Sequence, residues 1–126
     1  MKYKILAMAF VLTLTLISCA SVGVSTLKQY PAKSENCRLD IYTSRDDISK
    51  SFEVISVIDS RTGSTLFHSR TAAQAIENAR PYACQAGADA ILIKNAGTTG
   101  VGYSSWGEGN AIIEAIKYKK TIVSSK

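Results

Sequence analysis

The sequence predicts a small α+β domain in which one principal helix packs on a face of a mostly antiparallel sheet. Three observations carry this prediction. Residues 37–42 and 52–58 have strand patterns, residues 72–86 have apolar residues at helical spacing, and the apolar runs 90–93 and 111–118 follow. Strands grouped around a single helix are typical of the α+β class.

The first two predicted strands differ in how many of their faces are apolar. Cys37, Leu39 and Ile41 alternate with three other residues, which is the pattern of a half-buried strand. Residues 52–58 carry apolar side chains on both faces, since Phe52, Val54 and Ile58 alternate with Ile55 and Val57. We therefore expect residues 52–58 to be a central strand.

An alanine stripe predicts the helix. The stripe consists of Ala72, Ala75, Ile76, Ala79, Ala83 and Ala86. Ser69 or Thr71 can cap the start, and Gly87 is expected to end the helix. Pro81 falls inside the pattern and predicts a bend within one continuous helix.

Two further strands follow the helix. Residues 90–93 are apolar throughout and predict a buried strand, and residues 111–118 are apolar at first and basic at the end. We interpret the basic cluster of Lys117, Lys119 and Lys120 as a solvated strand end. Contact with anionic lipid headgroups is the alternative.

Residues 1–18 have the features of an export signal. Lys2 and Lys4 precede an apolar run of 13 residues, Ile5 to Ile17, which is shorter than the roughly 20 residues of a membrane-spanning helix. Leu16-Ile17-Ser18-Cys19 resembles the lipobox of bacterial lipoproteins. The resemblance implies a diacylglycerol attached to the Cys19 thiol through a thioether, cleavage before Cys19, acylation of the new amino terminus with a palmitate-type chain, and an outer-membrane location facing the periplasm. An uncleaved signal anchor, or an export signal with an incidental cysteine, is the alternative.

The chain after Cys19 is predicted to have two parts. Residues 19–36 are polar and show no sustained period, so we expect a lipidated cysteine followed by a flexible tether. Residues 37–126 form the single α+β domain, since the chain left after the signal is long enough for one domain only.

Cys37 and Cys84 remain once the signal and Cys19 are set aside. An even number of cysteines in an exported protein predicts one disulfide. Two free buried thiols are the alternative.

The order of motifs resembles a small bacterial domain of the YbjQ and RcsF type. The resemblance rests on Asp47-Ile48, on residues 52–58 and, above all, on Ala86-Gly87-Ala88-Asp89-Ala90-Ile91. It implies a lipid-anchored, disulfide-bonded envelope domain that acts through protein contacts. RcsF-like domains carry two disulfides, whereas only Cys37 and Cys84 are available here.

Catalytic and metal-binding patterns are missing from the sequence. His68 is the only histidine, no pair of cysteines has metal-ligand spacing, and no nucleophile motif appears. We expect no enzyme activity, no cofactor, no metal and no small-molecule substrate. The net charge of +5 is mild, and two of its lysines lie in the signal, so nucleic acid is not an expected partner either.

The segment from Gly97 to Gly109 is the candidate partner-binding loop. It holds five of the eight glycines, together with Tyr103 and the only tryptophan, Trp106. Aromatic residues of this kind are common interface anchors. The alternative is a hairpin tip whose rings fold back on the sheet.

The sequence as a whole predicts a lipid-anchored, non-enzymatic envelope lipoprotein. Its membrane contact is the N-terminal lipid, and its expected partner is another envelope protein. The alternative function is an RcsF-like envelope-stress sensor that signals to a regulatory partner.

Overall fold

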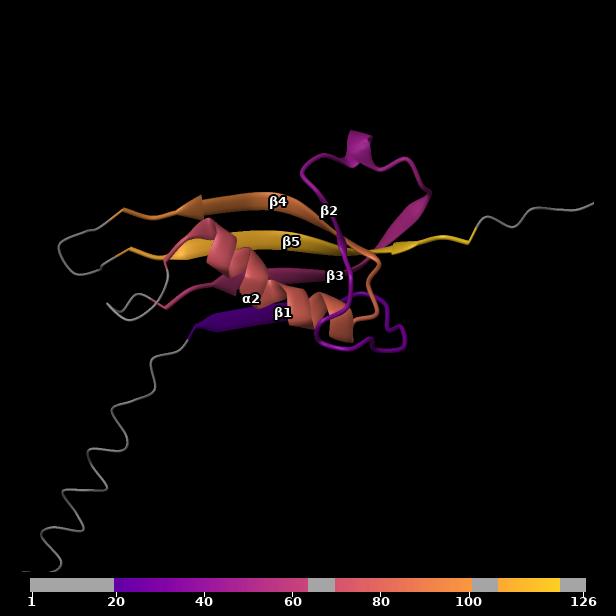
Figure 1. The fold of residues 1–126 in the computed structure, drawn as a ribbon, viewed down its shortest axis with the longest axis horizontal. Helices are drawn as coiled ribbons and strands as arrows, with labels where there is room; N and C mark the ends of the chain where they lie inside the picture. Colours follow the sequence, from indigo (N-terminus) through magenta and orange to yellow (C-terminus); the bar gives the residue numbers. More distant parts are fainter. Residues whose placement is uncertain (1–19, 64–69, 101–106, 121–126) are drawn as a thin grey trace, which may run out of the picture.

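The computed structural model describes residues 20–63, 70–100 and 107–120. They form one five-stranded sheet with a single α-helix on one face (Figure 1). The elements, in chain order, are β1 (Ser21–Thr26), β2 (Asp40–Tyr42), the short 3-10 helix η2 (Arg45–Asp47), β3 (Phe52–Arg61), α2 (Ala72–Gln85), β4 (Ala90–Thr98) and β5 (Gly109–Tyr118).

The strand order across the sheet is β1-β3-β5-β4-β2. Only the β2–β4 pair is parallel, and the other three pairs are antiparallel. The predicted α+β class with a mostly antiparallel sheet is therefore confirmed. β3 lies between β1 and β5, as the two apolar faces of residues 52–58 predict.

The helix begins and ends where the sequence predicts. The Thr71 side chain accepts a hydrogen bond from the backbone N–H of Gln74 at 3.1 Å and caps the first turn. Ala75, Ala79 and Ala83 are buried against the sheet, and their small side chains let α2 approach β3 and β5 closely. Pro81 lies inside α2, which continues to Gln85.

A β-bulge in β3 changes which side chains share a face. The pairing of β3 with β5 shifts between Val54 and Ser56. As a result Ile55 and Ile58 both join the core beneath α2, although simple alternation places them on opposite faces. The prediction for these two side chains was wrong because a sequence pattern does not reveal an inserted residue.

The sheet buries side chains on both faces. The larger core lies between α2 and the sheet and includes Ile55, Ile58, Ile91 and Ile113. A smaller cluster lies on the opposite face. It consists of Ile48, Ala90, Leu92 and Ile116, with Tyr42, Phe52 and Tyr118 packed around them.

The edge strand β1 lies in the segment 19–36, for which the sequence predicted a flexible tether. That prediction was wrong for residues 21–26. Residues 21–26 form β1, which pairs with β3 from Ser21↔Arg61 to Thr26↔Ser56. The backbone N–H groups of Leu27 and Lys28 both donate to the Ile55 carbonyl. The folded unit therefore begins at Ser21 rather than at Cys37. Cys19 and the signal lie outside the described residues.

The other edge strand is shorter than predicted. β2 covers only residues 40–42, and it pairs with β4. Leu39 is buried, but Ile41 is half exposed, whereas Tyr42 packs into the smaller cluster. The alternation across residues 37–42 therefore does not correspond to one half-buried strand.

Strands β4 and β5 extend further into the glycine-rich segment than predicted. β4 runs to Thr98 and β5 starts at Gly109, and Thr99 still bonds to Glu108. Tyr103 and Trp106 lie outside the described residues.

Gly87 is where the end of α2 meets the segment that follows β1. Its φ of +84° is a left-handed conformation. A Cβ at this position would lie 2.6 Å from the Pro31 carbonyl oxygen and 2.8 Å from the Tyr30 Cβ. Only glycine therefore lets this segment pack against the helix end.

The Gly87→Ala variant should test this close approach. We expect it to lose more than about 2 kcal/mol of unfolding free energy, because a left-handed alanine costs roughly 1–2 kcal/mol and the backbone contact adds to that. The matched control is Gly100→Ala, whose Cβ would meet nothing within 4 Å. Urea unfolding measures both, and equal stability of the two variants would contradict the packing at Gly87.

Candidate functional site: a cationic cleft at one end of the sheet

A network of charged side chains lies at one end of the sheet. The register places the end of β5 beside the start of β3 and the start of β4, through Tyr118↔Phe52 and Ile116↔Ala90. The segment that follows β1 and the end of α2 meet at the same end (Figure 1).

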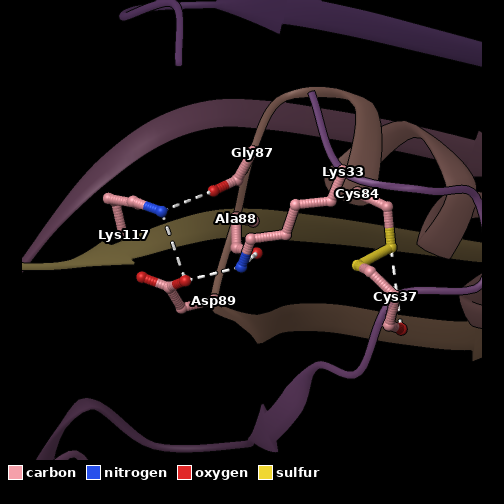
Figure 2. Close-up of a disulfide and its surroundings, with 7 residues drawn as sticks. All are labelled: Lys33, Cys37, Cys84, Gly87, Ala88, Asp89 and Lys117. Carbon is pink, nitrogen blue, oxygen red and sulfur yellow. Dashed lines mark hydrogen bonds and ion pairs between the residues drawn. A yellow bond between two sulfur atoms is a disulfide. The ribbon is translucent and has the colours of Figure 1, made fainter. Parts of the chain in front are cut away.

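Asp89 is the acceptor that joins these elements. Its Oδ1 receives the Lys33 ammonium at 2.6 Å and the Lys117 ammonium at 3.3 Å, and its Oδ2 receives the backbone N–H of Tyr118 at 3.0 Å. Figure 2 shows both lysine side chains directed at the Asp89 carboxylate from opposite sides. The local sequence around Asp89 does not indicate this bridge between three segments.

The two lysines make further bonds to the end of the helix. The Lys33 ammonium donates to the Ala88 carbonyl at 2.7 Å, and the Lys117 ammonium donates to the Gly87 carbonyl at 3.1 Å. Both carbonyls belong to the turn that follows α2, whose own last carbonyls accept the backbone N–H groups of residues 86–88. The lysines therefore neutralise Asp89 and also tie the turn after the helix to the segment after β1 and to β5.

The ionisation of Asp89 follows from these contacts. Burial raises the pKa of the Asp89 carboxyl. The hydrogen bonds from Lys33, the Tyr118 backbone and Lys117 outweigh burial, and the pKa lies below its ordinary value. The carboxylate is therefore held in its charged form at neutral pH.

We call the contacts of Asp89 with Lys33, Lys117 and the Tyr118 backbone the Asp89 junction. The predicted disulfide is confirmed next to it. Cys37 and Cys84 are bonded with an S–S distance of 2.04 Å and a Cα–Cα distance of 5.8 Å. The Lys33 backbone N–H also donates to the Cys84 carbonyl at 2.9 Å. The bond links residues 47 positions apart and restricts the unfolded chain by about 4 kcal/mol in the chain-entropy model.

A second set of interacting polar side chains lies at the same end of the sheet as the Asp89 junction. The Lys28 ammonium lies 3.1 Å from a Glu53 carboxylate oxygen, and the Tyr30 hydroxyl donates to the same carboxylate. The bond from Tyr30, followed by Lys28, lowers the pKa of Glu53. Tyr30 and Glu53 in turn raise the pKa of Lys28.

A cleft of about 510 Å³ opens between these groups. Its lining consists of Lys28, Tyr30, Glu53, Lys117, Tyr118, Lys119 and Lys120. Four lysines thus face one glutamate. The ammoniums of Lys28 and Lys117 lie 5.2 and 5.5 Å from the centroid of the Tyr30 ring, which supplies apolar surface.

The Tyr118 hydroxyl is held by two residues outside the cleft lining. Its hydroxyl donates to an Asp40 carboxylate oxygen at 2.7 Å and lies 2.9 Å from the Tyr42 hydroxyl. Burial, followed by the bonds to Tyr42 and Asp40, raises the pKa of Tyr118 far above its ordinary value. The phenol is therefore neutral at physiological pH, and the side chain is held in place by these bonds and by the smaller cluster.

The cleft has the chemistry of a binding site for negative charge. Within residues 20–63, 70–100 and 107–120, no group of three or more metal-binding side chains is present. The lysines and tyrosines of the cleft can attract an anionic group and pack against its carbon skeleton. We call this feature the cationic cleft.

The structure separates the residues that the sequence singled out. Cys37 and Cys84 come together beside the Asp89 junction, and Lys117, Lys119 and Lys120 lie in the cationic cleft. Sequence reasoning missed Lys28, Tyr30, Lys33 and Glu53 as site residues. It assigned the first three to a tether and Glu53 to an ordinary strand, and their only local signal is the clustering of lysine and tyrosine after β1.

The Asp89→Asn variant tests the ionic role of Asp89, because the unfolding free energy that it loses should depend on pH. Because the folded-state pKa is lowered, the carboxylate contributes stability above its ordinary pKa of about 3.9, and this contribution disappears as the pH falls through the folded-state value. We expect the variant to lose about 1–3 kcal/mol at pH 7 and clearly less at pH 3. Urea unfolding at both pH values measures the difference.

Asp59→Asn is the control for this experiment. Asp59 is exposed and its carboxylate lies 3.6 Å from Arg61, a surface pair expected to contribute roughly 0–1 kcal/mol. Equal losses for Asp89→Asn at pH 7 and pH 3 would contradict the ionic role of Asp89.

Comparison with known proteins finds no matching family model, no matching curated protein and no matching solved structure. Among the described residues, no helix combines the length and the apolar character that crossing a bilayer requires. The function must therefore be argued from the chain's own residues.

Proposed function

We propose that this chain is a lipid-anchored, non-enzymatic protein of the bacterial cell envelope, which acts through contact with another protein. The lipobox-like sequence ending at Cys19 supports the anchor. The disulfide between Cys37 and Cys84 supports an oxidising compartment such as the periplasm, since such bonds are rare in the cytosol.

The position of β1 is the observation that carries the proposal furthest. β1 starts at Ser21, two residues after Cys19, and two residues reach at most about 7 Å. An acylated Cys19 would therefore hold the start of β1 close to the membrane surface. The folded domain, and not a long tether, then determines how far the cationic cleft stands from the lipid.

The cationic cleft lies at the opposite end of the sheet from the start of β1. Ser21 pairs with Arg61, and Arg61 pairs with Asn110 near the start of β5, whereas the cleft includes Tyr118 at its end. Eight residue steps along β5, from Asn110 to Tyr118, separate the two ends by roughly 27 Å. When the strands of the anchored domain stand upright on the membrane, the cleft faces away from the anchoring membrane and towards soluble or membrane-bound partners.

The same geometry bears on the two interpretations of the basic cluster. Lys119 and Lys120 lie at the cleft end, so in this upright orientation headgroups of the anchoring membrane would be out of their reach. A surface at this distance from the membrane suits contact with a protein partner.

The Cys19→Ser variant tests the anchor. We expect the protein to leave the membrane fraction or to be mislocalised, and labelling by a palmitate analogue in cells to disappear, because the thiol that would carry the diacylglycerol is gone. The Cys37→Ser, Cys84→Ser double variant is the control, since it also removes thiols but keeps Cys19 and should still be labelled. Unchanged membrane fractionation and labelling of Cys19→Ser would overturn the lipid-anchored function.

A further inference from the structure

We propose that the cationic cleft binds a carboxylate-rich segment of the protein partner. This inference rests on the proposed function, because it names the chemistry of the partner through which that function is exerted. It assigns a binding role to the basic cluster of Lys117, Lys119 and Lys120, together with Lys28 and Tyr30, which the sequence did not indicate as site residues.

The charge of the cleft favours an anionic ligand. Its lining has four lysines and one glutamate, and Glu53 is already paired with Lys28 and Tyr30. Lys119 and Lys120 make no side-chain hydrogen bond or ion pair with any other residue in the described part of the chain. These two ammoniums are therefore available to a ligand without breaking an internal contact.

The inner wall of the cleft is held in place before any ligand arrives. Lys117 is fixed by Asp89 and the Gly87 carbonyl, and Tyr118 is fixed by Asp40 and Tyr42. The Lys50 ammonium, 4.5 Å from the centroid of the Tyr118 ring, adds a further positive charge nearby. A preorganised wall lowers the entropic cost of binding.

The Tyr30 ring favours a peptide over a free inorganic anion. A phosphate or sulfate ion would use only the ammonium groups, whereas the ring of Tyr30 offers apolar surface to the carbon chain of a glutamate or to a neighbouring side chain. A volume of about 510 Å³ also exceeds the needs of one small anion. It lies in the range of about 300–1,000 Å³ that is typical of ligand sites.

Anionic lipid is the other common source of negative charge in an envelope. The proposed attachment at Cys19 keeps the anchoring membrane at the start of β1, and the cleft lies at the far end of the sheet. A protein segment is therefore the favoured occupant.

Binding of a fluorescein-labelled hexaglutamate peptide to the full-length protein in non-ionic detergent tests the assignment. Fluorescence anisotropy should show saturable binding at 50 mM NaCl that weakens at 300 mM NaCl, because exposed charges are screened by salt. A hexaglutamine peptide, which has the same length and no carboxylate side chains, should not bind. Absence of hexaglutamate binding, or equal binding of hexaglutamine, would overturn the proposal.

Two charge-reversed variants locate the binding. Lys119→Glu should weaken hexaglutamate binding about tenfold, equivalent to about 1.4 kcal/mol. Lys94→Glu is the matched control, because Lys94 is exposed on β4 outside the cleft lining and the variant has the same net charge. Equal weakening by both variants would indicate a general charge effect and contradict a site at the cleft.

Competition experiments distinguish the possible sources of negative charge. Inorganic phosphate and phosphatidylglycerol vesicles should each displace the peptide poorly at matched negative charge. If phosphate displaces the peptide as effectively as unlabelled hexaglutamate does, the cleft binds small anions in general and the peptide assignment is wrong. Preferential vesicle binding that Lys119→Glu abolishes would assign it to lipid.

Failure of this proposal can be distinguished from failure of the proposed function. The peptide assay in detergent does not require membrane anchoring, so loss of the anchor in the Cys19→Ser test leaves its outcome unchanged. Crosslinking in intact cells gives the second readout. If Lys119→Glu captures the same partner as strongly as the parent protein, the protein-contact function stands and the cleft is not its site.

Discussion

The Asp89 carboxylate is the interaction on which this end of the molecule depends. It stands just after α2, and it accepts bonds from the Lys33 ammonium, the Lys117 ammonium and the backbone N–H of Tyr118. These groups come from the segment after β1 and from β5, so one side chain joins three parts of the chain. Without that charge, two partly buried lysines would lose their common partner, and the inner wall of the cationic cleft would lose its fixed position.

The disulfide and Gly87 act on the same junction by different means. The Cys37–Cys84 bond limits how far residues 31–37 can move from α2, and the left-handed Gly87 lets Tyr30 and Pro31 approach the helix end. Covalent restriction, close packing and charge pairing therefore all hold the segment after β1 against the domain. The consequence for function is geometric. The folded unit starts two residues after Cys19, and the proposed recognition surface stands at the other end of the sheet.

The sequence predicted the parts of the fold that local patterns determine. The alanine stripe, the Thr71 cap and the Gly87 stop define α2 because each acts within a few residues. β1 was missed because an edge strand has little buried surface of its own, and Ser21–Thr26 shows no alternation of exposed and buried residues. Long-range contacts were missed for a related reason. Lys33 and Asp89 are 56 residues apart, and nothing in either local sequence shows that they meet.

Hydrogen–deuterium exchange of residues 20–37 in the full-length protein tests most directly whether the segment after Cys19 is part of the folded domain. The amides of Leu27 and Lys28 donate to Ile55, and the amide of Lys33 donates to Cys84. These amides should exchange far more slowly than an unstructured peptide of the same sequence. Exchange of the whole segment at the rate of a free peptide would restore the flexible tether and contradict both the junction at Asp89 and the position of the cleft relative to the membrane.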